Sequence, residues 1–99
     1  MNGDEIIEGM AQDFSTHLSD LLHLNDAPAD EFYDPITKAL GDNPTQESVI
    51  EFYLDADGPR SIASELNSWL EIDEVTPEIA KDLLRLTIIN NFGADSLPS

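Results

Sequence analysis

Along the first quarter of the chain, apolar residues recur at intervals of three and four, which is the spacing of one face of an α-helix. The apolar positions of this face are Ile7, Met10, Ala11, Phe14, Leu18, Leu21 and Leu22. Polar residues fall largely on the opposite side, and the acidic residues of the first turn suit the positive end of the helix dipole. The pattern predicts a helix over residues 4–24.

The next segment, residues 29–40, combines helical spacing with a break in its middle. Residues 25–28 (Asn-Asp-Ala-Pro) end the first helical pattern, and Gly41 is a natural stop for the second. Within the segment, Asp34 followed by Pro35 has the form of a helix cap with proline at the first helical position. The segment is therefore predicted to be either one short helix after a turn or two abutting turns.

Two more helices are predicted in the middle of the chain. Asp42-Asn43-Pro44 repeats the order of cap and proline, and apolar residues at helical spacing follow as far as Leu54. Residues 57–59 (Asp-Gly-Pro) are typical of a turn. Residues 59–70 then carry an apolar face made of Ile62, Leu66, Trp69 and Leu70.

A last helix is predicted to begin after Thr76, which is followed by Pro77, and to end at Gly93. No segment alternates apolar and polar residues as a strand would; only residues 86–89 (Leu-Thr-Ile-Ile) have the β-branched content that favours a strand. The predicted fold class is all-α, a compact bundle of four to five short helices. Residues 1–93 form the single acidic domain, and residues 94–99 are expected to be a frayed C-terminal tail.

Charge is the main compositional feature of this chain. Twenty-one Asp and Glu residues face four Lys and Arg residues, which gives a net charge of −17 over 99 residues. Such a chain is a poor ligand for nucleic acid or anionic lipid, whereas cationic protein surfaces attract it. The chain has no cysteine, no apolar run of the roughly 20 residues that a membrane span needs, and an acidic N-terminus unlike a secretory signal. These features predict a soluble cytoplasmic protein (in the host cytoplasm if phage-encoded).

Motifs for metal binding or catalysis are incomplete. In an EF-hand alignment that starts at Asp55, the sixth position is Arg60 and the twelfth is Leu66, so the calcium ligands fail. Asp13 and His17 lie one helical turn apart, but no third ligand completes a metal site. Residues 93–97 (Gly-Ala-Asp-Ser-Leu) resemble the phosphopantetheine attachment motif of acyl carrier proteins, yet no room remains for the helix that follows it there. We predict no enzymatic activity, no metal and no cofactor.

The acidic residues themselves are the best candidates for a binding site. Rows of carboxylates on rigid helices imitate the charge density of nucleic acid without any base. The expected acidic face consists of Glu5, Glu8, Asp13, Asp20, Asp26, Asp30, Glu31 and Asp34. In composition and architecture the whole chain is similar to the DNA-mimic proteins of phages and mobile elements, of the anti-restriction or anti-CRISPR type. The resemblance implies an inhibitor whose partner is a basic nucleic-acid-binding protein.

Other functions for an acidic helical domain stay open. One is an immunity protein or antitoxin that neutralises a nuclease toxin, for which Tyr33 is the candidate aromatic anchor and Phe32, Tyr53 and Trp69 are expected in the core. Another is a non-catalytic acidic adaptor with no connection to nucleic acid. A solvated or halophilic surface would produce the same charge without any partner.

Overall fold

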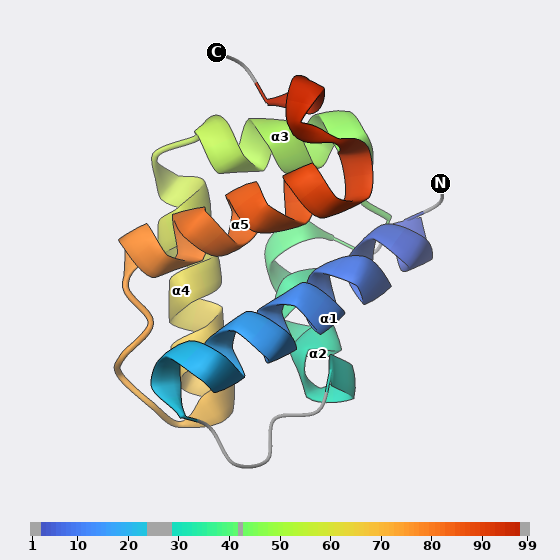
Figure 1. Ribbon diagram of the computed structural model, residues 1–99. Helices are drawn as coiled ribbons and strands as arrows, with labels where there is room; N and C mark the ends of the chain where they lie inside the picture. The colour runs from blue at the N-terminus through green and yellow to red at the C-terminus, as the bar shows by residue number, and fades with distance from the viewer. Residues whose placement is uncertain (1–2, 24–28, 42, 98–99) are drawn as a thin grey trace.

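The computed structural model describes residues 3–23, 29–41 and 43–97. This part of the chain contains five α-helices, one 3-10 turn and no strand (Figure 1). The elements are α1 (Gly3–Leu22), α2 (Ala29–Leu40), α3 (Gln46–Leu54), α4 (Asp57–Leu70), α5 (Pro77–Phe92) and η1 (Ala94–Ser96). The all-α prediction is confirmed, and residues 86–89 lie inside α5 rather than in a strand.

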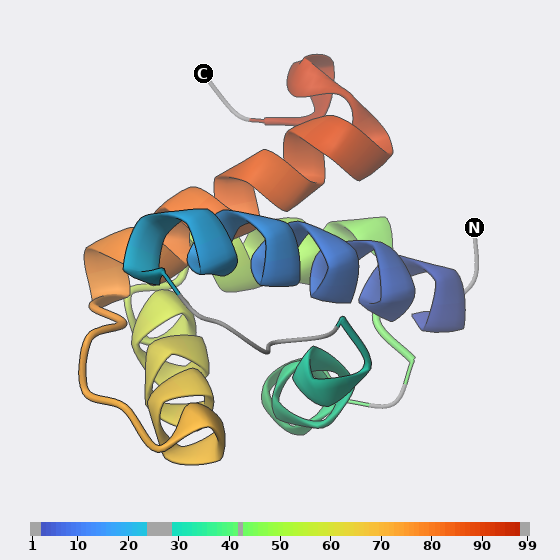
Figure 2. The ribbon, with the colours of Figure 1, turned by 60° about the horizontal axis from the view of Figure 1, so that its bottom comes forward.

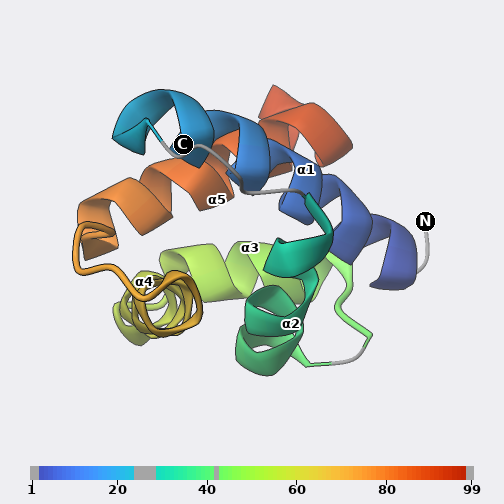
Figure 3. The same ribbon diagram turned by 90° about the horizontal axis from the view of Figure 1, so that it is seen from below.

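The helices form two sides around a shared interior. Helices α1 and α5 lie next to each other on one side of the molecule, while α2 and α4 stand side by side on the other (Figures 2 and 3). Helix α3 packs against both α4 and α5. Each helix therefore contributes one face to the interior and leaves the other to solvent.

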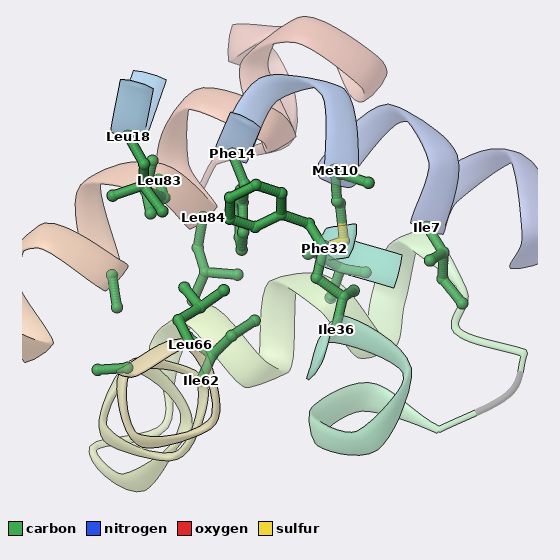
Figure 4. Packing of buried hydrophobic residues seen from close by; sticks show 14 of the residues in the cluster. Ile7, Met10, Phe14, Leu18, Phe32, Ile36, Ile62, Leu66, Leu83 and Leu84 are labelled. Atoms are coloured by element: carbon green, nitrogen blue, oxygen red, sulfur yellow. The ribbon is translucent and has the colours of Figure 1, made fainter. Parts of the chain in front are cut away.

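The core is built from apolar residues that all five helices supply. Phe14 and Phe32 are its largest fully buried side chains, and they meet residues of α4 and α5 in the centre of the bundle (Figure 4). Burying side chains of this size stabilises the fold by roughly 1.5–3 kcal/mol each. The fully buried large side chains are Phe14, Phe32, Ile6, Ile7, Met10, Leu18, Ile36, Ile62, Leu66, Leu83, Leu84 and Ile88.

The predicted apolar faces differ from the buried ones near the ends of helices. Leu21, Leu54 and Trp69 were expected to point inward, but their side chains are 48 %, 56 % and 46 % exposed. Each lies in the last turn of its helix. Helical spacing therefore identifies the face correctly and overestimates its length.

The start of α5 follows the predicted capping chemistry, whereas the cap predicted for α3, Asn43 before Pro44, is wrong. The Thr76 side chain accepts a hydrogen bond of 3.2 Å from the backbone N–H of Ile79, and Pro77 occupies the first helical position of α5. Helix α3 is capped by Thr45, one residue after the expected proline, through a reciprocal pair of hydrogen bonds with Ser48. The capping hydroxyl supplies the acceptor that the first turn of a helix lacks.

The predicted turn before α4 is wrong, because the helix begins two residues earlier. The backbone N–H of Asp57 donates to Asp55 Oδ1 at 3.0 Å, and helical geometry starts there. Gly58 lies so close to the Phe52 carbonyl that a Cβ atom would collide with it. Pro59 sits in the first turn, where its missing N–H leaves no helical bond unmade.

Helix α2 is continuous, which decides between the two readings of residues 29–40. Pro35 is inside the helix and buried. Asp34-Pro35 is therefore not a fresh helix start. Gly41 ends the helix with a φ of 91°, in the left-handed region that favours glycine.

The C-terminal segment folds back on the bundle as far as it is described. Ala94–Ser96 form a 3-10 turn, the Ser96 hydroxyl donates to the Phe92 carbonyl, and Leu97 packs against the core. Gln46 of α3 also donates to the Ser96 hydroxyl at 3.1 Å. Residues 94–97 thus make specific contacts where we expected a frayed tail, while residues 98–99 lie outside the described part of the chain.

Candidate functional site: acidic surfaces and an aromatic groove

The carboxylates lie almost entirely on the surface. Seventeen of the nineteen described Asp and Glu residues are exposed, and only Asp13 and Glu65 are half-buried. All four cationic side chains, Lys38, Arg60, Lys81 and Arg85, are exposed as well. Because cations are so few, α1, α2, α3 and α4 each carry a net negative charge, whereas α5 holds two carboxylates and two cations. Helix α1 carries no Lys or Arg at all.

Most residues of the predicted acidic face belong to helices α1 and α2. The two helices pack against each other (Figure 2), and seven exposed carboxylates belong to this pair. We call them the α1–α2 acidic face: Asp4, Glu5, Glu8, Asp20, Asp30, Glu31 and Asp34. Of the other predicted members, Asp26 lies outside the described residues and Asp13 has a different environment.

Tyr33 stands within this face, between the two helices. Its hydroxyl donates a hydrogen bond of 3.4 Å to the backbone carbonyl of Asp4, and its ring packs partly against the core. Burial raises the pKa of the Tyr33 phenol, and the negative charges of Asp4 and Glu8 raise that pKa further. The predicted aromatic anchor is thus half-buried, neutral at physiological pH and surrounded by carboxylates.

Asp13 faces α5 instead of open solvent. Its carboxylate accepts hydrogen bonds from the Thr87 hydroxyl at 2.9 Å and from the side-chain amides of Asn90 and Asn91, each at 3.3 Å. Asn91 in turn donates to Thr87 Oγ1, so the four side chains form one network between α1 and α5. Asp13 therefore joins two helices, and its carboxylate is less available to a partner than those of the α1–α2 acidic face.

A second acidic surface, which the sequence analysis did not single out, lies between α4 and α5. Glu71, Asp73, Glu74 and Glu78 are exposed within eight residues of one another. The Asn67 side chain makes two hydrogen bonds to the backbone of Val75 and so fixes the connecting segment. The density of acidic residues at 71–78 was a visible signal in the sequence.

An open groove of about 520 Å³ lies between α2 and α4. Trp69, which we expected in the core, forms part of its wall with nearly half of its side chain exposed. The other lining residues are Asp34, Pro35, Thr37, Lys38, Glu65 and Ser68. The groove combines an aromatic surface with charges of both signs.

The described residues include no group of three or more His, Asp and Glu side chains arranged to hold a metal ion. Asp13 is occupied by the network with α5, so its predicted proximity to His17 did not produce a cluster. Asp55 Oδ1 accepts a hydrogen bond from the backbone N–H of Asp57 at the start of α4.

Another aromatic residue forms an internal contact with a cation. The Lys81 ammonium lies 5.4 Å from the centre of the Tyr53 ring, within the range of a cation–π interaction. Tyr53 is also partly packed on the core, as expected. One of the four cations is therefore engaged within the chain.

Comparisons of the chain with models of known protein families, with curated proteins and with solved structures found no match. In the described residues, no helix has the length and apolar character needed to cross a membrane.

Proposed function

We propose that this chain is a non-catalytic acidic protein that occupies the basic nucleic-acid-binding groove of a target protein, as a nucleic-acid mimic. The observation that carries the proposal is the exposure of seventeen of the nineteen described carboxylates on short helices and the segments between them. Such a surface attracts lysine- and arginine-rich grooves over long range and repels nucleic acid. The proposed targets are a restriction enzyme, a CRISPR effector complex or another DNA- or RNA-binding protein.

The charge density of α1 alone is too low for mimicry. Asp4 and Asp20 are sixteen residues apart, which corresponds to roughly 24 Å along the helix axis. In that length one DNA strand places about seven phosphates, at roughly 3.4 Å each. Helix α1 offers four exposed carboxylates there, and α2 brings the number on the α1–α2 acidic face to seven. The pair of helices, rather than one of them, is the unit that compares with a nucleic-acid strand.

A second candidate function is the neutralisation of a nuclease toxin by an immunity protein or antitoxin. Tyr33 favours it, because a half-buried aromatic residue flanked by Asp4 and Glu8 has the composition of a binding hot spot. In that case one aromatic truncation, Tyr33→Ala, would remove most of the affinity through faster dissociation. A mimic would instead lose affinity gradually as charges are removed.

The experiment that tests the proposal uses nucleic acid as the competitor. The chain is immobilised, incubated with a bacterial lysate at low salt and washed, and bound proteins are released with duplex DNA. Proteins identified by mass spectrometry are then purified and assayed for binding of fluorescent DNA in the presence of the chain. We expect the chain to displace DNA from its target, with an affinity that falls steeply as salt rises.

Two variants with the same change in net charge locate the binding face. One carries Glu8→Lys, Asp20→Lys, Asp30→Lys and Glu31→Lys on the α1–α2 acidic face. The control carries four reversals at exposed positions of α3, α5 and η1: Glu47→Lys, Glu51→Lys, Asp82→Lys and Asp95→Lys. We expect the first variant to associate more slowly than the control. If captured proteins resist release by DNA and both variants bind equally well, nucleic-acid mimicry is the wrong function.

A further inference from the structure

The groove between α2 and α4 holds the one tryptophan of the chain in an exposed position. The indole of Trp69 is 46 % exposed although it lies beside Leu66 and Leu70, which contact the core. About half of this large apolar residue therefore remains in contact with water. Tryptophan is also the side chain that offers the best surface for a cation.

The polar groups of the groove favour a ligand that donates hydrogen bonds. Asp34 and Glu65 approach the groove from α2 and α4, and Glu65 is half-buried. Thr37 also lines the groove, although its Oγ1 is itself buried, and this oxygen makes no hydrogen bond within the described structure. Both carboxylates accept hydrogen bonds and donate none, so a ligand that brings N–H donors fits this groove.

The net charge of the groove favours one added positive charge. Lys38, four residues after Asp34 on the same helix, supplies one cation against the two carboxylates. A single bound cation would therefore make the groove neutral. The groove has a volume of about 520 Å³, which is more than one side chain fills. The whole side chain that carries the cation, and the backbone next to it, would therefore enter the groove.

From these features we infer that the groove receives an arginine side chain of the partner protein, with the guanidinium stacked on Trp69 and bound by Asp34 and Glu65. Guanidinium suits this site better than ammonium because it is planar, stacks on aromatic rings and presents five donors to carboxylates and hydroxyls. The inference rests on the proposed function, which supplies a partner rich in arginine and lysine. It adds a specific anchor to an attraction that is otherwise diffuse.

The direct test uses a hexapeptide of alternating Arg and Gly, with two matched peptides that carry citrulline or Lys in place of Arg. Trp69 is the sole tryptophan, so its fluorescence reports on the groove alone. At physiological ionic strength, which screens non-specific attraction, we expect the Arg peptide to reduce acrylamide quenching of Trp69 in a saturable way. The neutral citrulline peptide should have no effect, and the Lys peptide should bind several-fold more weakly.

Variants separate the groove from general charge. Asp34→Asn with Glu65→Gln should weaken binding of the Arg peptide about tenfold or more, as expected for two lost charge-assisted contacts. The control pair Glu47→Gln with Asp95→Asn removes the same net charge at exposed positions of α3 and η1. Trp69→Ala has no tryptophan fluorescence, so its binding is measured by the anisotropy of a labelled Arg peptide. We expect a similar loss of affinity in this variant. Equal affinities for the groove variant and the control pair, or unchanged Trp69 quenching at saturating peptide, would overturn the inference.

Failure of the groove and failure of the proposed function give different results. If Trp69→Ala leaves displacement of DNA from the target unchanged while the α1–α2 charge reversals abolish it, mimicry stands and the arginine anchor does not. If the Arg peptide binds at Trp69 but no captured protein is released by DNA, the groove stands and the partner is of another kind. Circular dichroism of each variant, compared with the unmodified chain, checks that the fold is retained.

Discussion

The side-chain amide of Asn67 binds both backbone polar groups of Val75. Its Nδ2 donates to the Val75 carbonyl and its Oδ1 accepts from the Val75 N–H, both at 2.9 Å. The amide thus satisfies two backbone groups that regular secondary structure would otherwise pair, in a segment that is neither helix nor strand. This pairing holds Val75 in the core and fixes the acidic residues between α4 and α5 around it.

Replacing Asn67 should therefore destabilise the fold although the residue is only half-buried. Asn67→Ala leaves two backbone groups of Val75 without partners, which costs about 1–3 kcal/mol in unfolding free energy. Urea denaturation followed by circular dichroism measures the change. Ser64→Ala, at an exposed position of the same helix, serves as the control and should alter stability by less than about 0.5 kcal/mol. Equal stability of the two variants would show that the pairing contributes nothing.

Glu71 ends α4 in a conformation that suits glycine. Its φ of 57° and ψ of 43° are left-handed, and its N–H donates to the Asn67 carbonyl. Holding a non-glycine residue in the left-handed conformation costs about 1–2 kcal/mol. Glycine avoids this cost, but it also raises the conformational entropy of the unfolded chain, which offsets part of the gain in stability. We expect Glu71→Gly to raise the unfolding free energy by about 0.5–1 kcal/mol. Glu71→Ala removes the same charge without relieving φ, so an equal gain in both variants would assign the effect to charge.

Asp13 tests whether a carboxylate in this acidic chain can stabilise the fold. Asp13→Ala removes the acceptor for Thr87, Asn90 and Asn91 and should lower the unfolding free energy by about 1–3 kcal/mol. Asp20→Ala, at an exposed position of the same helix, should be neutral or slightly stabilising because it reduces repulsion. Thermal denaturation of the two variants gives the comparison. If both substitutions stabilise the chain equally, repulsion outweighs the network at Asp13.

The sequence predicted most of the fold because its local signals agree with one another. Thr76 before Pro77 and Gly93 at the far end delimit α5 within one residue of the structure. Asp57-Gly58 was wrongly predicted to lie in a turn between helices, because the same residue types occur in such turns and in the first turn of a helix. In the structure the close approach of the Phe52 carbonyl requires the glycine. That requirement depends on the neighbouring helix and is invisible in a local pattern.

The candidate site was less predictable than the fold because it depends on which helix covers which residue. Asp13 and Asp20 are seven residues apart and looked equivalent, yet α5 lies over Asp13 and leaves Asp20 exposed. Trp69 continues the apolar spacing of Leu66 and Leu70, yet it borders the groove with α2. Periodicity along one helix gives directions around its axis, whereas exposure follows from the positions of the other helices.

Tyr33 provides a spectroscopic measure of the α1–α2 acidic face. In a Tyr53→Phe variant it is the only tyrosine, so the ultraviolet absorbance of phenolate reports its ionisation alone. Burial and the carboxylates of Asp4 and Glu8 raise its pKa, so we expect a titration midpoint above the ordinary value of 10.0. Glu8→Gln should move the midpoint part of the way back, since burial and Asp4 still act. Glu47→Gln, which removes the same charge from α3, should leave it nearly unchanged.

The same pKa shift predicts how stability depends on pH. Between about pH 10 and the folded-state pKa of Tyr33, the unfolded chain has lost the phenol proton while the folded chain still holds it. Stability therefore falls as pH rises through this interval, and the favourable contribution of the neutral phenol is complete only below it. Tyr33→Phe, with no proton to lose, should show a smaller fall over the same interval in urea denaturation. A titration midpoint at or below 10.0, or an identical pH dependence for Tyr33→Phe, would mean that neither burial nor the charges of Asp4 and Glu8 raise the pKa of this phenol.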